Sequence, residues 1–112
     1  MRFLGYTLAN EADQPTEPPS PDMYEKMGAF VEGATKAGVI VATGGIAPTS
    51  EGAKIALNDG EFTVVDGPFA EAKELVGGWA LMECRDRNEA IEWSKRFLSV
   101  LGQGEVRVRP CM

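Results

Sequence analysis

A run of apolar residues at 79–84, Trp-Ala-Leu-Met-Glu-Cys, constrains the fold of this chain more than any other segment. Successive side chains of a strand point to opposite faces, so a strand of this composition is apolar on both faces almost to its end. Such strands lie inside sheets whose two faces are both covered. The segment therefore predicts a central strand and a sheet that needs a cover on each side.

Two segments have the pattern of helices suited to that cover. Ser20-Pro21-Asp22 is typical of a helix start, and apolar residues then recur at helical spacing as far as Gly38, which predicts a helix over about 21–37. A second long helix is expected after Asp86, because Asp86 and Glu89 have the spacing of a capping box. Both helices are therefore predicted to have defined N-terminal caps.

The other ordered segments are short and rich in strand formers, and two of them flank Asn58-Asp59-Gly60, a strong hairpin signal. These strand-like segments are 3–8, 39–42, 53–57, 62–65 and 105–109. Residues 70–75 predict a short helical turn that ends at Gly77-Gly78. This glycine pair and Gly44-Gly45 are both interpreted as bends.

The resulting order is strand, helix, strand, hairpin, strand, helix, strand. It predicts an α+β fold of the ferredoxin-like split βαβ type with an inserted hairpin, as one domain over residues 1–112. Both helices are expected on one face of the sheet. The second face is then expected to meet another subunit, which predicts a homodimer joined sheet to sheet.

The charge of the chain excludes some classes of partner. Its formal net charge is -6 and its pI is near 4.6, so its field repels polyanions. We therefore expect neither nucleic acid nor a membrane as a partner. The N-terminal residues lack the pattern of a secretory signal, which favours a cytoplasmic protein.

The reactive residue types narrow the chemistry further. The two cysteines, Cys84 and Cys111, are not clustered, and in a reducing compartment they are expected to be free thiols. The chain contains no histidine, the commonest general base and transition-metal ligand. The sequence therefore predicts no metal site and no cofactor.

Asp66-Gly67-Pro68-Phe69 marks the predicted functional pocket. Asp66 follows a strand, and as a catalytic base or anchor it is expected to line a cleft with Lys73, Arg107 and Arg109, three cations suited to an anionic ligand. Each of these residues also has a structural interpretation: Asp66 caps a turn, the arginines pair with Glu83 or Glu105, and Lys73 belongs to a solvated helical turn. Gly67, Pro68 and Phe69 are expected to shape the loop.

Three groups of residues together resemble the DGPF subfamily of the YCII-related proteins. They are Val64 to Glu74, Gly77 to Leu81 followed by Asn88 to Trp93, and the closing Glu105 to Pro110. The resemblance implies a ferredoxin-like domain assembled as a dimeric α/β barrel. It also implies a bacterial protein, often encoded beside extracytoplasmic-function sigma factors, with no established general biochemical role. The His of the wider family's His-Asp pair is absent here, which leaves Asp66 without that partner.

These observations leave two functional hypotheses and a structural alternative. The first is a small protein that binds a polar or anionic organic molecule near the Asp66 loop, with or without weak catalysis by Asp66. The second is a regulatory or partner-binding protein, without catalysis, that is associated with an extracytoplasmic-function sigma factor. A purely structural dimer is the remaining alternative.

Overall fold

The computed structural model of the chain describes residues 1–9, 20–68 and 75–112. Its centre is a four-stranded antiparallel sheet with the strand order β2-β5-β1-β6. The four strands are β1 (Arg2–Ala9), β2 (Ile40–Gly45), β5 (Leu75–Glu83) and β6 (Val106–Pro110). β5 lies between β1 and β2, which confirms the central strand predicted from its apolar composition.

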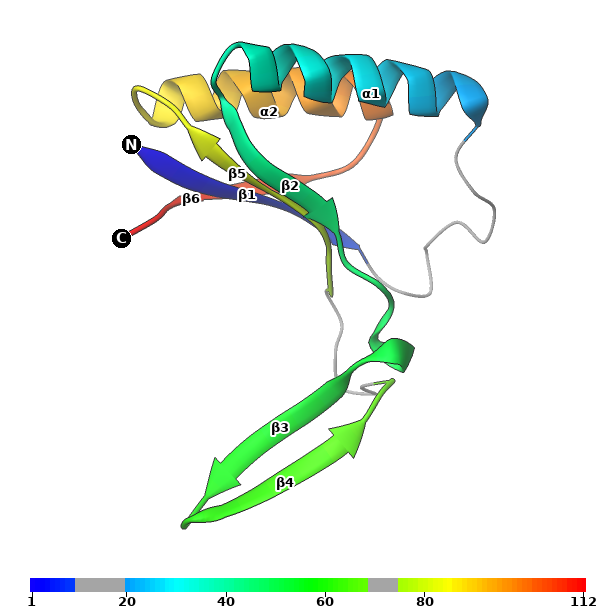
Figure 1. Cartoon of the computed structure of the whole chain (residues 1–112), viewed down its shortest axis with the longest axis vertical. Helices are drawn as coiled ribbons and strands as arrows, with labels where there is room; N and C mark the ends of the chain where they lie inside the picture. The colour runs from blue at the N-terminus through cyan, green and yellow to red at the C-terminus, as the bar shows by residue number, and fades with distance from the viewer. Residues whose placement is uncertain (10–19, 69–74) are drawn as a thin grey trace.

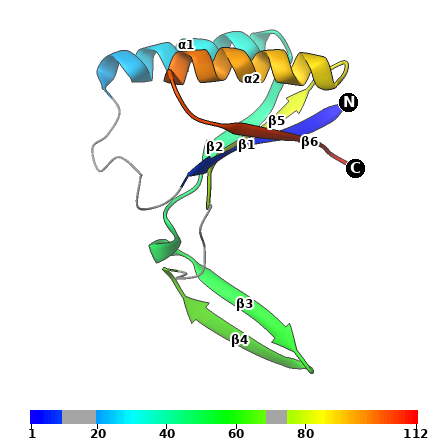
Figure 2. The same ribbon diagram turned by 180° about the vertical axis from the view of Figure 1, so that it is seen from behind.

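Two helices connect these strands and lie together on one face of the sheet (Figures 1 and 2). Helix α1 (Pro21–Lys36) joins β1 to β2, and α2 (Arg87–Leu101) joins β5 to β6. Each βαβ unit is split by a strand of the other unit, since β5 separates β1 from β2 and β1 separates β5 from β6. This is an α+β arrangement consistent with the ferredoxin-like fold expected from the sequence.

Both helix starts are capped as predicted. The Ser20 hydroxyl accepts a hydrogen bond from the Met23 backbone N–H at 3.2 Å, and the Asp86 carboxylate accepts one from the Glu89 N–H at 2.9 Å. The Glu89 carboxylate reaches back to the N–H of Arg85 at 3.1 Å, one residue beyond the cap. These caps satisfy backbone donors that have no partner inside the helix.

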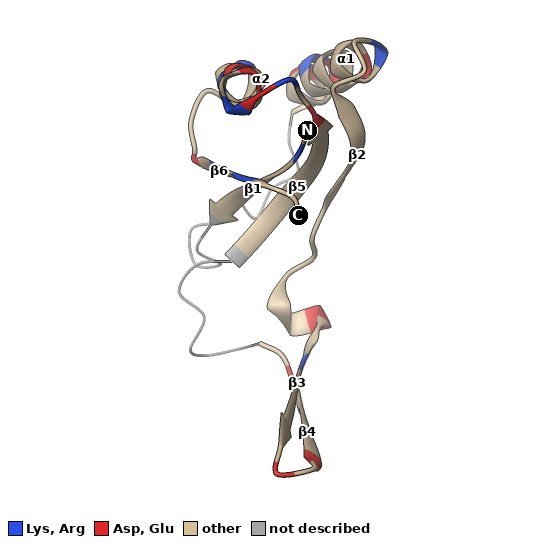
Figure 3. Ribbon diagram, turned by 90° about the vertical axis from the view of Figure 1, so that its left-hand side faces the viewer, with Lys and Arg blue, Asp and Glu red and all other residues tan. Residues whose placement is uncertain are grey.

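The core lies between the helices and one face of the sheet. Its buried residues are Phe3, Val39, Met82, Cys84 and Ala90, with Ala80, Trp93 and Val108 packed against them. Side chains alternate along a strand, so the residues next to Phe3 and Met82 point away from the helices. No helix covers that second face in the described part of the chain (Figure 3).

The second face, called the open sheet face below, is apolar at its centre and charged at one edge. The strand register pairs Tyr6 with Trp79 and Leu4 with Leu81 on this face. Strand β6 adds Arg107 and Arg109, which alternate with the two valines that face the helices. The open sheet face therefore combines a partly exposed apolar centre with an arginine edge.

A hairpin of β3 (Ala53–Asn58) and β4 (Glu61–Asp66) follows β2 and extends away from the sheet on the side opposite the helices (Figures 1 and 3). Its turn confirms the prediction from Asn58-Asp59-Gly60: Asp59 and Gly60 have φ of 50° and 81°, the signs that a two-residue hairpin turn requires. A short 3-10 helix, η2 (Thr49–Glu51), precedes it. At the base of the hairpin, the Gly67 N–H donates to the Gly52 carbonyl at 2.9 Å.

The structure corrects the interpretation of the two glycine pairs as bends. Gly44-Gly45 and Gly77-Gly78 lie inside β2 and β5, where Gly44 pairs with Trp79 and Gly45 with Gly78. A Cβ on Gly44 would lie 3.3 Å from the Trp79 indole, so the glycine lets that ring lie across the neighbouring strand. Strand β5 also begins at Leu75, where a helical turn was expected to end. Residues 70–74 of that expected turn lie outside the described residues.

Gly67 provides a test of the loop at the hairpin base. A Cβ at this position would overlap the carbonyl oxygen of Thr49, so Gly67→Ala requires a backbone shift and should cost roughly 1–3 kcal/mol. Gly33→Ala is the matched control, because a Cβ there meets nothing within 4 Å in the last turn of α1. Alanine in a helix should raise stability by about 0.5–1 kcal/mol. Thermal unfolding measures the stability of both variants, and hydrogen exchange at β3 and β4 shows whether Gly67→Ala loosens the hairpin. Equal stability of the two variants would contradict the packing of Gly67 against Thr49.

Candidate functional site

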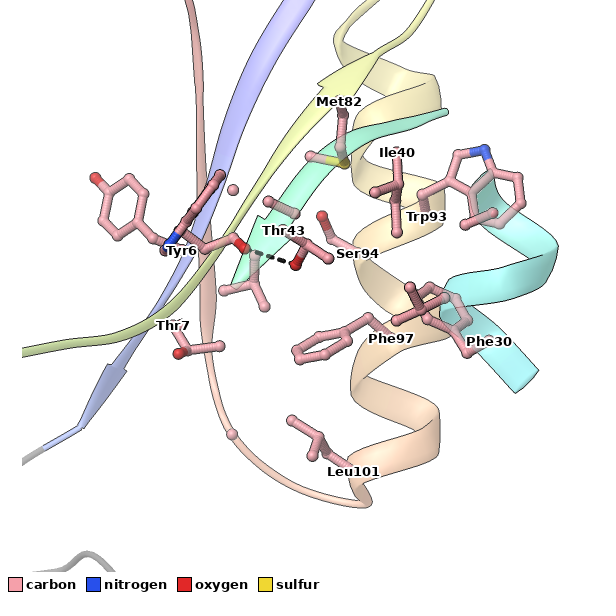
Figure 4. A pocket seen from close by; sticks show the side chains of 18 of the residues that line it. Tyr6, Thr7, Phe30, Ile40, Thr43, Met82, Trp93, Ser94, Phe97 and Leu101 are labelled. Carbon is pink, nitrogen blue, oxygen red and sulfur yellow. Dashed lines mark hydrogen bonds between the residues drawn. The ribbon is translucent and has the colours of Figure 1, made fainter. Parts of the chain in front are cut away.

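A cavity of about 380 Å³ lies between the sheet and the two helices. Its size falls within the range of small-molecule sites, roughly 300–1,000 Å³. Strands β1, β2 and β5 form one wall, and α1 and α2 form the other (Figure 4). The cavity therefore lies between the two layers of one chain, is partly open to solvent, and shares Tyr6 and Trp79 with a depression on the open sheet face.

Small residues form the wall on the sheet side. Gly5, Gly78 and Ala80 line the cavity at positions that face the helices, where other strands would place larger side chains. Gly5 has a packing reason to be small, because a Cβ there would come within 3.1 Å of the Met82 Cε. At Gly78 a Cβ would have only ordinary contacts, at 3.4 Å from the Thr7 Oγ1 and 3.6 Å from the Gly44 carbonyl oxygen. Neighbouring atoms therefore do not require a glycine at position 78, and the missing side chain leaves part of the cavity empty.

Aromatic side chains form the wall on the helix side. The Phe30 ring of α1 lies 6.1 Å from both the Trp93 and the Phe97 rings of α2, in tilted arrangements. The Arg96 guanidinium stacks 4.6 Å from the centre of the Trp93 ring. Because aromatic pairs of this geometry hold each other in place, they fix the distance between the helices above the small residues of the sheet.

A few hydroxyl groups interrupt the apolar lining. The Thr43 hydroxyl donates to the Trp79 carbonyl at 2.7 Å, and the Ser94 hydroxyl donates to the Ala90 carbonyl at 2.8 Å. Figure 4 shows both side chains between the strands and α2, whereas Tyr6 points away from the helices. Each hydroxyl hydrogen is already used, so the oxygen is left as an acceptor. The cavity thus suits a mainly apolar molecule that carries a hydrogen-bond donor.

The sequence-predicted site residues lie elsewhere. Asp66 is exposed at the end of β4, on the hairpin. Arg109 lies on the open sheet face, in a shallow depression with Leu4, Tyr6 and Trp79. The Arg107 Nε pairs with the Glu105 carboxylate at 3.2 Å. Within one chain, then, Asp66 is on the hairpin and the two arginines are on β6.

Lys73 lies outside the described residues. A site that unites Lys73 with Asp66, Arg107 and Arg109 stays a prediction. The sequence reasoning missed the cavity itself. Its signal was present in the small residues Gly5, Gly78 and Ala80, which occupy alternating positions on the helix-facing side of neighbouring strands.

Two further findings concern the described residues only. In residues 1–9, 20–68 and 75–112, no helix is long and apolar enough to cross a membrane. In the same ranges, no three Cys, Asp or Glu side chains gather in a way that would hold a metal ion.

The fold and the cavity define a small α+β protein of the ferredoxin-like type with an internal apolar pocket. The model of the YCII-related domain matches residues 1–111, so the chain belongs to that family. It is also similar to an uncharacterized protein of Rhizobium meliloti (strain 1021), with 33% identity over 76 residues. That match covers 67% of this chain and 61% of the length of the relative.

Both cysteines are free thiols, as predicted, and they differ in reactivity. Burial raises the pKa of the Cys84 thiol above its ordinary value of 9.0, and the Glu89 carboxylate adds to the effect, whereas Cys111 is exposed. Iodoacetamide at neutral pH should therefore alkylate Cys111 at least about a hundredfold faster than Cys84. Because the unfolded chain releases the Cys84 proton more easily, folding stability should fall as the pH rises through and above 9.0.

Mass spectrometry of timed alkylation measures the two rates, and a Cys111→Ser variant isolates the slow thiol. Equal rates at the two cysteines would contradict the burial of Cys84 against α2.

Proposed function

We propose that this protein binds a small, mainly apolar organic molecule with one hydrogen-bond donor in the cavity between the sheet and the helices. The observation that carries the proposal is the 380 Å³ cavity, with small residues on one wall and aromatic rings on the other. Protein interiors are normally close-packed, with few voids larger than a water molecule. A partly open pocket of this size with an apolar lining breaks that packing between the two layers and is suited to a small-molecule ligand.

The glycine at position 78 supports the same proposal. Glycine inside a strand weakens it, typically by about 0.5–1 kcal/mol relative to alanine, and it often marks the close approach of a ligand. Gly78 has neither a left-handed backbone nor a crowded Cβ position to explain its presence. A bound molecule that occupies this space would explain why position 78 is a glycine.

We also propose that the protein belongs to the DGPF subfamily, because it contains the segment Asp66-Gly67-Pro68-Phe69. We further propose that it is a cytoplasmic bacterial homodimer. The exposed apolar centre of the open sheet face supports the dimer, because such a face is suited to a sheet of a second copy. Two sheets packed in this way would form a dimeric α/β barrel with a ligand cavity in each subunit.

Catalysis by Asp66, with Lys73, Arg107 and Arg109 holding an anionic ligand, is a separate proposal. Its support is that β4 ends at Asp66 and the chain then continues to β5, whose residues Gly77 and Gly78 line the cavity. Turnover of a bound ligand that is unchanged in Asp66→Asn would remove this residue from any chemistry.

The regulatory hypothesis, in which the chain acts with an extracytoplasmic-function sigma factor, is the second candidate function. It is supported by the net charge of -6 together with the exposed apolar face, which suit a protein partner with a basic rim. Recovery of one stoichiometric partner from a bacterial extract, with binding that is insensitive to filling of the cavity, would favour it over the ligand-binding proposal.

Filling the cavity tests the ligand proposal directly. A thermal-shift screen of small aromatic and alicyclic alcohols and amines should find compounds that raise the unfolding temperature of the wild type. Gly78→Leu places a side chain into the cavity and should weaken the binding of those compounds at least about tenfold in calorimetric titrations. Gly28→Ala is the matched control, because a Cβ there meets nothing within 4 Å, and it should leave binding unchanged.

The ligand-free Gly78→Leu protein should remain folded, since the new side chain occupies empty space. Compounds that bind Gly78→Leu as tightly as the wild type, or the absence of any binding compound in the screen, would contradict a site in this cavity.

A further inference from the structure

The β3–β4 hairpin has two chemically different faces. Its register pairs Ile55 with Val64 and Leu57 with Phe62, so these four side chains share one face, called the apolar hairpin face below. Their exposed fractions run from 58% at Leu57 to 73% at Phe62. The other face is mainly polar and carries one large apolar side chain, Val65; its residues are Lys54, Ala56, Asn58, Glu61, Thr63 and Val65. An apolar face this exposed is unusual for a soluble strand pair.

The position of the hairpin makes this exposure harder to explain within one chain. It extends away from the sheet and helices, and no other element of the described residues covers it (Figures 1 and 2). A two-stranded hairpin alone in water is marginally stable at best, and an independent one needs a third strand or a packing partner. The apolar hairpin face therefore needs a cover from outside this chain.

The open sheet face of a second copy matches that need in hydrophobicity. Its depression is lined by Leu4, Tyr6, Ile46, Val76, Trp79 and Arg109, among other residues. Leu4 is 37% exposed and Ile46 51% exposed, so the depression is also apolar surface without a cover. Both apolar surfaces lack a cover within the described part of one chain. In the face-to-face dimer the centre of the open sheet face meets the partner's sheet, and its β6 edge, where the depression includes Arg109 and Pro110, is left for the hairpin.

The charges of the two surfaces are complementary. Around the hairpin, Glu51, Asp59, Glu61 and Asp66 are acidic and only Lys54 is basic, within residues 49–68. The edge of the open sheet face has Arg107 and Arg109 on β6. Two copies of a chain with net charge -6 repel each other overall, so close association requires local complementarity of this kind.

The strand order gives the two surfaces a way to meet. The hairpin follows β2, at one edge of the sheet, and the arginines lie on β6, at the other edge. In a dimer with sheets face to face and a two-fold axis parallel to the strands, the β2 edge of each copy lies over the β6 edge of its partner. Asp66 shares the apolar hairpin face, because it pairs with Ala53 in the same register as Ile55 with Val64.

We propose that each hairpin clasps a second copy of the chain, with its apolar face against the β6 edge of the partner's open sheet face, beside the contact between the two sheets, and with Asp66 beside Arg109 of that copy. The proposal rests on the homodimer of the proposed function and adds the element that holds it together. Asp66 is then a contact between subunits, and an isolated chain lacks the arginine that accompanies it.

Adjacent residues of β4 provide a matched test. Val64 lies on the apolar hairpin face and Thr63 on the opposite face, and both are exposed strand residues. Val64→Lys should raise the dimer dissociation constant at least about tenfold by sedimentation equilibrium, whereas Thr63→Lys should change it less than about twofold. Equal effects of the two lysines, or a wild type that is monomeric at about 100 μM, would overturn the proposal.

Charge reversal tests the contact between Asp66 and Arg109. Asp66→Arg and Arg109→Asp should each weaken the dimer, and the double variant, which has the net charge of the wild type, should recover most of the lost affinity. Circular dichroism confirms that each variant is folded. A double variant no tighter than the weaker single variant would overturn this contact.

The result is separable from the ligand proposal. Gly78→Leu changes the internal cavity and should leave the dimer dissociation constant unchanged, whereas Val64→Lys should leave cavity binding in the monomer intact. A monomeric wild type that still binds compounds in the cavity would contradict the hairpin contact alone, whereas a dimer that binds no compound would contradict the ligand proposal alone.

Discussion

The structure depends on one packing constraint: a single layer of two helices covers one face of a sheet whose central strand is apolar on both. Helices α1 and α2 bury Phe3, Val39 and Met82 on their side. Trp79 and Leu81 of the same strand are left on the other side with Leu4 and Tyr6. Full burial of a large apolar side chain is worth about 1.5–3 kcal/mol. Tyr6, Trp79 and Leu81 are already half-buried, so the free energy still available on the open sheet face is a few kcal/mol, an appreciable fraction of the roughly 5–15 kcal/mol that stabilises an ordinary domain.

The same layer of helices also sets the size of the cavity. Aromatic contacts of Phe30 with Trp93 and Phe97 fix α1 against α2 at a distance that the small residues of the sheet do not fill. Larger residues at Gly78 and Ala80 would close the gap without strain on the backbone. The cavity is therefore a consequence of side-chain choice on β5, and it can be tested independently of the fold. The proposed association rests on the open sheet face and the hairpin, while the proposed ligand binding rests on the cavity.

The local features of the fold were predictable because they depend on short-range physics. The caps at Ser20 and Asp86, the hairpin turn at Asp59-Gly60 and the central strand at 79–84 follow from hydrogen bonding, backbone preference and burial within a few residues. The glycine pairs were misassigned for the same reason. Glycine has a poor strand propensity, but Gly44 pairs with Trp79 because the neighbouring indole needs the space. The contact between Gly44 and the Trp79 indole depends on the pairing of β2 with β5, which the local sequence does not specify.

The candidate site was harder to predict, because it depends on which faces meet. Charged residues such as Asp66 and Arg109 attract notice in a sequence, whereas a pocket formed by Gly78 and Ala80 depends on the absence of side chains. The arginines alternate along β6 as expected, yet one chain places them away from the hairpin that holds Asp66. Proximity of these groups would require a second copy of the chain, and residue patterns along one chain do not specify how copies meet.

Methyl NMR under xenon pressure tests the central claim, that the space between the sheet and the helices is a cavity able to take up a ligand. Xenon enters apolar cavities without needing a specific hydrogen bond. The account predicts saturable shift changes at the methyl groups of Val31, Met82 and Leu101, which line the cavity, and much smaller, non-saturating changes at Ile55 and Leu57 on the hairpin. Non-saturating changes of equal size at all five residues would contradict it.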